Sequence, residues 1–69
     1  MISNEVVGFC IRRFRKEKLK ITQEEAAFRC NMDVRVFGEI ERGKAFRSPS
    51  LFKIVEGLGM TLDDFRVEE

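Results

Sequence analysis

The sequence predicts an all-α fold of five short helices, packed as one domain over residues 1–69. A chain of 69 residues has room for one small hydrophobic core, which favours compact helical packing over long loops. Its single proline and five glycines indicate no linker and no internal repeat. Apolar residues recur at the three- and four-residue spacing of helices, between recognisable start and stop signals.

The first helix is expected over residues 5–18. Asn4 is a suitable N-cap, because its side chain can accept a hydrogen bond from the first turn. Apolar residues follow at helical spacing: Val7, Cys10, Ile11 and Phe14. Gly8 costs about 1 kcal/mol relative to alanine, so it indicates either close packing or simple tolerance. Leu19 or Ile21 is expected to lie under the following turn.

A second helix, begun at Thr22, and a tight turn come next. Thr22 and Glu25 have the spacing of a capping box, in which each side chain accepts a hydrogen bond from the other residue's backbone N–H. Asn31 is expected to end this helix, because asparagine tolerates the left-handed conformation used there.

A third helix is expected over about residues 33–42. Asp33 is a suitable N-cap, and Gly43 a suitable stop. Phe37 and Ile40 are expected to face the core. Residues 22–43 therefore form a unit of two helices joined by a turn.

The C-terminal third carries signals for two more helices. Ser48 is expected to cap a helix whose first position is Pro49, and Gly59 is expected to end it. The apolar face of this helix comprises Leu51, Ile54, Val55 and Leu58. Thr61 is expected to begin a last short helix. Asp63 and Asp64 would lie in its first turn, where acidic side chains are favourable. Leu62 and Phe65 would point inward.

Charge is unevenly distributed, although the formal net charge is only +1. One basic group comprises Arg12, Arg13, Arg15, Lys16, Lys18 and Lys20, and a second comprises Arg42, Lys44 and Arg47. The C-terminal acids are Asp63, Asp64, Glu68 and Glu69. The domain is therefore expected to have a basic side and an acidic end.

Several classes of function are disfavoured. The chain contains no histidine, and no serine, cysteine or lysine has a recognisable activating partner, so an enzyme is not expected. Cys10 and Cys30 are expected to be buried, reduced thiols, with no metal site and no cofactor. No apolar run approaches the roughly 20 residues of a membrane span, and no signal peptide is recognised.

Four segments in order are RxFRKEK, TQEEAA, ExERG and KIVEGLGMTLDDF. Together they resemble the phage repressor and Cro-type helix-turn-helix family, also called Xre-type. The resemblance covers nearly all of the chain. It implies a five-helix, lambda-repressor-like fold that binds duplex DNA, typically as a dimer.

The resemblance, carried over residue by residue, implies a DNA-binding surface formed by Thr22, Gln23, Val34, Arg35, Val36, Gly38, Glu39, Arg42 and Lys44. The third helix would enter the major groove. There Arg35 would pair with guanine, Glu39 would accept a hydrogen bond from a cytosine amino group, and Val34 or Val36 would touch a thymine methyl.

The same resemblance implies contacts to the DNA backbone and a structural pair. Gln23, at a helix start, would hold a phosphate, and Arg42 and Lys44 would meet others. Arg15 and Glu41 resemble an ion pair that ties the first helix to the third.

The sequence departs from the family pattern at several positions. Ala26 replaces the usual leucine, and Phe28 stands where a charged residue is usual. Phe28 is therefore interpreted either as a core filler that compensates for Ala26, which is the favoured interpretation, or as an exposed aromatic residue that serves a partner. The segment before Thr22 is one residue longer than usual, and Asn31 replaces a glycine. Gly38 lies inside the third helix, where it allows close approach to DNA or weakens the helix.

The function predicted from these residues is transcriptional regulation by a cytoplasmic protein of bacterial or phage origin, acting as a homodimer on a palindromic operator. Met60, Phe65 and Val67 are the candidate dimer contacts. The alternative is a protein-interaction module on the same fold, antitoxin-like or binding a polymerase or other partner. The low net charge, Gly38 and Glu39 favour this alternative.

Overall fold

A computed structural model describes residues 3–67 as short helices joined by turns. In chain order the elements are α1 (Asn4–Arg13), the π-helix η1 (Phe14–Leu19), α2 (Gln23–Arg29), α3 (Val34–Glu41), α4 (Ser48–Leu58) and the 3-10 helix η2 (Leu62–Phe65). The predicted all-α class is confirmed for these residues, which contain no strand. The count of five α-helices is not confirmed, because the last helix is a single 3-10 turn.

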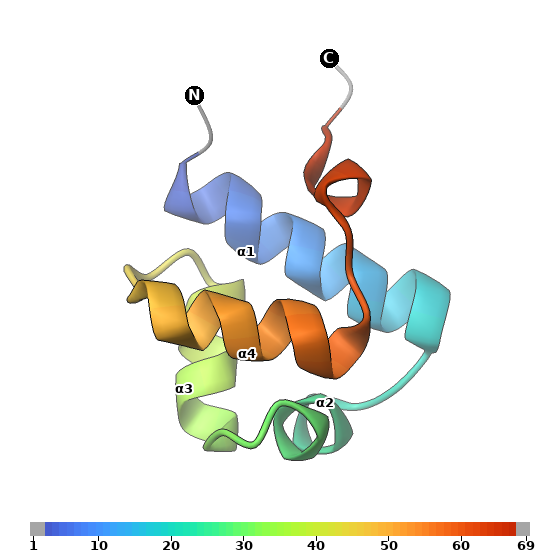
Figure 1. Cartoon of the computed structure of the whole chain (residues 1–69), viewed down its shortest axis with the longest axis vertical. Coiled ribbons are helices and arrows are strands. Elements are labelled where there is room, and N and C mark those ends of the chain that lie inside the picture. Colours follow the sequence, from blue (N-terminus) through green and yellow to red (C-terminus); the bar gives the residue numbers. More distant parts are fainter. Residues whose placement is uncertain (1–2, 68–69) are drawn as a thin grey trace.

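The helices surround one hydrophobic core. Figure 1 shows α1 and η2 in the upper part of the view, α4 across the middle, and α2 and α3 below. α1 packs against α3 and η2, while α2 packs against α3 and α4. The largest fully buried side chains come from three of these helices and are Cys10, Ile11, Phe37 and Ile54. The core therefore fixes where α2 and α3 lie relative to α1.

The N-cap of α1 differs from the prediction. Ser3, not Asn4, caps the helix: its Oγ accepts a 3.2 Å hydrogen bond from the Val6 N–H, and Asn4 is the first helical residue. Both residue types are good N-caps, so the sequence alone did not separate them.

The helical path continues past α1 as η1, up to Leu19. A π-helix takes more residues per turn than an α-helix, so this segment accommodates the additional residue before Thr22 without a longer loop. Lys20 then adopts a left-handed conformation (φ 56°), and the Ile21 N–H donates to the Arg15 carbonyl at 3.3 Å. Arg15, within η1, is buried.

α2 begins as predicted at Thr22, whose Oγ1 accepts a 3.1 Å hydrogen bond from the Glu25 N–H. The second half of the expected capping box does not form, because the Glu25 carboxylate pairs with Arg29 at 3.0 Å. Asn31 ends the helix in the left-handed conformation (φ 54°). The backbone N–H of Met32 donates to the Ala27 carbonyl at 3.0 Å and closes the turn.

α3 begins and ends at the predicted residues. The Asp33 carboxylate accepts a 2.7 Å hydrogen bond from the Arg35 N–H, which makes it the N-cap. Gly43 leaves the helix with φ 95°, and the Lys44 N–H donates back to the Glu39 carbonyl at 3.1 Å. Both ends of α3 are thus set by local hydrogen bonds.

Two glycines allow helices to approach closely. A Cβ on Gly8 would lie 2.8 Å from the Glu41 carbonyl oxygen, so α1 and α3 meet at a distance that only glycine permits. A Cβ on Gly57 would lie 2.8 Å from the Cys30 Cα, which has the same consequence for α4 and α2. Of the two expectations for Gly8, close packing is the correct one.

The interpretation of Phe28 as a core filler is wrong. Its side chain is 82% exposed, whereas Ala26 is fully buried. Ala26 packs in the core without a contribution from Phe28. Phe28 is therefore an exposed aromatic residue on α2.

The C-terminal helices differ from the prediction in two details. Arg47 is the N-cap of α4, so Ser48 is the first helical residue and Pro49 the second. Gly59 ends the helix as predicted, with φ 74°. Leu62 does not point inward and is 89% exposed, while Phe65 is partly buried against the core.

The start of η2 has a complete capping box. The Thr61 N–H donates to the Asp64 carboxylate at 2.7 Å, and the Thr61 side chain caps the backbone in return. Of the predicted acidic end, Glu68 and Glu69 lie outside the described residues.

Both cysteines are buried free thiols, as expected. Within residues 3–67, no group of three or more His, Cys, Asp or Glu side chains is placed to hold a metal ion. None of the helices in this part of the chain has the length and apolar character that crossing a membrane requires.

Candidate nucleic-acid interface

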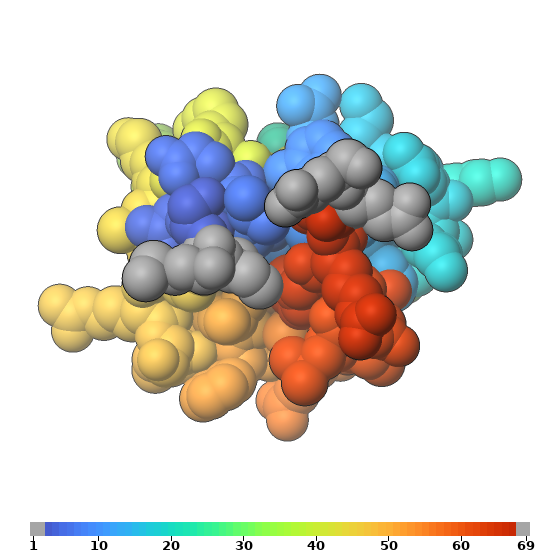
Figure 2. Space-filling view, turned by 90° about the horizontal axis from the view of Figure 1, so that it is seen from above, coloured from blue at the N-terminus to red at the C-terminus, as the bar shows by residue number. Residues whose placement is uncertain are grey.

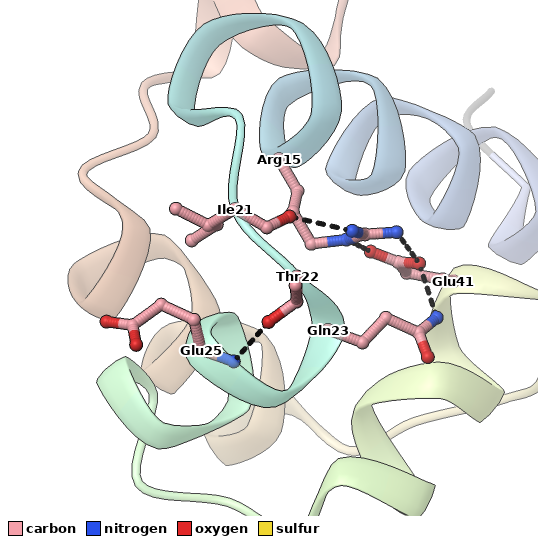
Figure 3. A network of polar contacts seen from close by, with 6 residues as sticks. All are labelled: Arg15, Ile21, Thr22, Gln23, Glu25 and Glu41. Carbon is pink, nitrogen blue, oxygen red and sulfur yellow. Dashed lines mark hydrogen bonds and ion pairs between the residues drawn. The ribbon is translucent and has the colours of Figure 1, made fainter.

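A buried polar network joins three helical elements (Figure 3). Arg15 binds the Glu41 carboxylate through two hydrogen bonds, Nε–Oε2 at 2.6 Å and Nη2–Oε1 at 3.1 Å. Its Nη1 also donates to the Ile21 carbonyl at 2.9 Å. The ion pair expected between Arg15 and Glu41 is therefore present, and it is almost completely removed from solvent. It fixes the end of α3 against η1.

Gln23 belongs to the same network. Its Nε2 donates a 2.9 Å hydrogen bond to Glu41 Oε1, so the first residue of α2 is tied to the last residue of α3. The side chain is thereby oriented across the two helices. The backbone N–H groups at a helix start favour anions, so Gln23 lies at a position suited to a phosphate.

Gly38 does not lie on an exposed face, contrary to the expectation for it. It is buried beneath the side chains of Gln23 and Arg42. A Cβ there would lie 3.3 Å from Arg42 Nη1 and 3.5 Å from Gln23 Oε1. The glycine therefore gives these two side chains room to cross α3, and direct contact between Gly38 and DNA is not supported.

The exposed face of α3 is formed near its N-terminus. Val34 and Val36 are 40% and 41% exposed, and Arg35 between them is also exposed. Glu39 is half-buried, and its carboxylate lies 3.8 Å from Lys44 Nζ. This ion pair partly neutralises both residues, so Arg35 is the main cationic group of the face.

A cationic hollow lies at the opposite end of α3, between α1, η1, α2 and the last residues of α3. Its volume is about 230 Å³, and it is lined by Arg12, Arg15, Gln23, Glu41 and Arg42. Arg15 and Glu41 neutralise each other by their ion pair. Arg12 and Arg42 therefore leave the hollow with an excess of positive charge, which suits a phosphate.

Arg12 was not among the site residues expected from the sequence. Arg12 lies three positions before Arg15 and therefore on the same side of the helix. The expected pairing of Arg15 with Glu41 could thus have placed Arg12 near the end of the third helix. Arg12 belongs to a group of six basic residues, and their charge alone does not distinguish which of them lies at the site.

A model of helix-turn-helix domains matches residues 11–65. The chain belongs to the helix-turn-helix family. This confirms the family resemblance found in the sequence. The family consists of DNA-binding regulators and is not a family of enzymes. No curated protein and no solved structure matches the chain significantly.

Not every arginine of this helix-turn-helix domain is available to DNA. Arg13 Nη2 donates to two backbone carbonyls near the C-terminus, that of Arg66 at 2.8 Å and that of Asp64 at 3.3 Å. Its guanidinium also lies 5.5 Å from the centre of the Phe9 ring. Arg13 therefore holds the C-terminal segment against α1, and the first basic group is divided between two roles.

An apolar groove lies where the start of α1, α4 and η2 meet. Figure 2 shows these three elements on one face of the molecule. Its volume is about 630 Å³ and its lining residues are Asn4, Val7, Phe46, Leu51, Phe52, Val55, Leu62, Phe65 and Arg66. Phe52 is 63% exposed, and Leu62 projects still further. Of the three candidate dimer contacts, Met60 is buried in the core, so the prediction for Met60 is wrong. Phe65 lines the groove, and Val67 is exposed.

Proposed function

We propose that this helix-turn-helix domain binds duplex DNA sequence-specifically and regulates transcription, with α3 in the major groove. The observation that carries the proposal is the cationic hollow that Arg12 and Arg42 form with Gln23 at the end of α3, the helix whose start is exposed. Such a hollow holds the DNA backbone, while the neighbouring side chains contact the bases. The match of the chain to a family of DNA-binding regulators supports the same function.

The residues proposed to contact the bases form what we call the reading face: Val34, Arg35, Val36 and Glu39. Arg35 pairs with guanine, because a guanidinium can donate to both O6 and N7. Val34 and Val36 supply apolar contact to thymine methyl groups. Glu39 accepts a hydrogen bond from a cytosine amino group once its ion pair with Lys44 opens.

The backbone contacts surround this reading face. Gln23 and Arg42 hold a phosphate at the hollow, and Lys44 meets a second one after its ion pair opens. Thr22 contributes by capping α2, which keeps the first turn of that helix in place. Gly38 contributes by leaving room for Gln23 and Arg42.

We also propose that two copies bind a palindromic operator. A single module of this size buries only about 600 to 1,000 Å² on DNA, which is little for specific recognition. The apolar groove supports self-association, since Leu62 projects beside a hollow that can accept the same residue of a second copy. Phe65 and Val67 belong to this contact.

The proposal is tested by measuring binding to duplex DNA at several salt concentrations and by selecting bound sequences from a random duplex pool. We expect affinity to fall steeply with salt and the selected sequences to be palindromes with half-sites about one helical turn apart. Absence of binding, or binding that hardly depends on salt, would refute the proposal. Selection of single, non-repeated sites would refute the dimer.

A second candidate function is protein binding on the same fold. The observation that favours it is Phe28, an aromatic residue on α2 that is exposed and does not belong to the hydrophobic core. If the domain binds no duplex DNA in the salt titration but retains a protein partner that a Phe28→Ser variant loses, this second function is supported instead.

A further inference from the structure

The outer side of α1 and η1 carries a strip of basic and aromatic surface that lies apart from the exposed start of α3. Phe9, Arg12 and Lys16 are exposed there, and Phe9 is 53% exposed. With Arg13 and Glu17 they enclose a hollow of about 300 Å³. The strip lies outside the helix-turn-helix motif of residues 22–43.

Arg12 connects this strip to the candidate DNA interface. It lines the hollow on α1 and also the cationic hollow shared with Gln23 and Arg42. Positive charge therefore continues from the end of α3, through Arg12, to Lys16.

The neighbours of the strip define which groups are available for a ligand. Arg13 is committed to the Asp64 and Arg66 carbonyls and to the Phe9 ring. Arg12 and Lys16 have no ion pair within the described residues, whereas Lys44, Arg15 and Arg29 do. Glu17 is the one acid that lines this hollow, against three basic residues.

We propose that Arg12 and Lys16 bind consecutive phosphates of the DNA strand that enters the cationic hollow, so that α1 extends the backbone contact beyond the motif. The inference rests on the proposed function. Arg12, near the end of α1, and Lys16, in η1, line the same hollow, so both side chains can reach one short stretch of a DNA strand. Phe9 adds apolar surface where the sugars lie.

The test compares the salt dependence of binding, on a selected operator and on random duplex DNA, for Lys16→Ala, Arg12→Ala and Lys53→Ala. Lys53 is exposed on α4 and lines neither hollow, so Lys53→Ala removes the same charge away from the strip. We expect each of the first two variants to reduce the slope of log affinity against log salt by about 0.9, and Lys53→Ala to leave it unchanged. Arg12→Lys should keep the wild-type slope.

The outcomes separate this inference from the function on which it rests. The loss in affinity should be equal for operator and random DNA, because phosphate contacts carry no sequence information. If the wild-type domain binds DNA with a steep salt slope and both alanine variants keep that slope, the strip on α1 has no role and this inference alone fails. If the wild-type domain binds no duplex at all, the proposed function fails and this inference with it.

Discussion

Gln23 Nε2 donates a 2.9 Å hydrogen bond to Glu41 Oε1, across the 18 residues that separate the start of α2 from the end of α3. The same carboxylate accepts two hydrogen bonds from Arg15. Glu41 therefore holds together the framework on which the candidate interface is built. Its neighbour Arg42 lines the cationic hollow with Gln23.

Replacement of Glu41 by alanine should strongly destabilise the domain. It leaves the buried Arg15 guanidinium without its carboxylate, and breaking a buried pair in this way costs about 3–5 kcal/mol. Denaturant unfolding should show this loss. The matched control is Glu25→Ala, whose pair with Arg29 is about half exposed and should cost less than about 1 kcal/mol. Similar small losses from both variants would contradict the assigned role of Glu41.

Two glycine substitutions should have opposite effects. Gly38→Ala replaces a glycine inside a helix, which should increase helix stability by about 1 kcal/mol. The added Cβ meets only the ends of the Gln23 and Arg42 side chains, which can move. We expect unchanged or increased stability but weaker DNA binding, because both side chains must shift. Gly8→Ala places its Cβ against backbone of α3 and should destabilise the fold by about 1–3 kcal/mol. Thermal unfolding and DNA titration of both variants check this; equal stabilities would refute it.

Arg35→Ala and Arg42→Ala should weaken DNA binding differently. Arg35 is exposed on the reading face, so its loss should cost about 1–3 kcal/mol on the operator and relax specificity at one base pair. Arg42 lines the cationic hollow, so its loss should weaken operator and random DNA alike. Titrations on both DNAs test the assignment. Equal, sequence-independent losses from the two variants would show that Arg35 does not read a base.

Leu62→Glu should prevent self-association without unfolding the domain. Leu62 is almost fully exposed beside the apolar groove, so a carboxylate there costs the monomer little but is buried in the proposed dimer. Sedimentation with and without operator DNA measures the effect. Phe28→Glu is the control, since Phe28 is comparably exposed but does not line the groove, and it should leave the oligomeric state unchanged. An unchanged assembly in both variants would place the dimer contact elsewhere.

Stability should fall in alkaline solution because of the two buried thiols. Burial raises the pKa of Cys10, against a smaller opposing effect of the Arg13 charge, and burial also raises the pKa of Cys30. Above the ordinary pKa of 9.0 the unfolded chain loses these protons while the folded chain keeps them, so the free energy of unfolding decreases as pH rises. A Cys10→Ala/Cys30→Ala variant should show a shallower decrease in denaturant unfolding above pH 9. An identical pH dependence would contradict this prediction.

The pairing at the centre of the candidate site was only partly predictable. Arg15 and Glu41 are 26 residues apart, and the family resemblance, not the local pattern, indicated that they meet. The hydrogen bond from Gln23 to Glu41 and the position of Arg12 beside it emerged only from the packing of α1, α2 and α3. No spacing rule in one helix reports which atom of another helix lies opposite.

The positions at which α2, α3 and α4 begin and end were largely determined by the sequence alone. Thr22 and Asp33 cap their helices through hydrogen bonds to N–H groups two or three residues away, and Asn31, Gly43 and Gly59 end theirs through positive φ angles. These effects act within a few residues, so a local pattern is sufficient to predict them.

The faces of those helices were decided by the tertiary structure. Gly38 is buried because two long side chains cross it, Met60 is buried, and Leu62 and Phe28 are exposed, each against expectation. Burial depends on which distant segments approach a residue, and here glycines at α1 and α4 set those approaches. The sequence by itself therefore determined the helix-turn-helix unit, whereas only long-range packing determined which of its side chains are exposed.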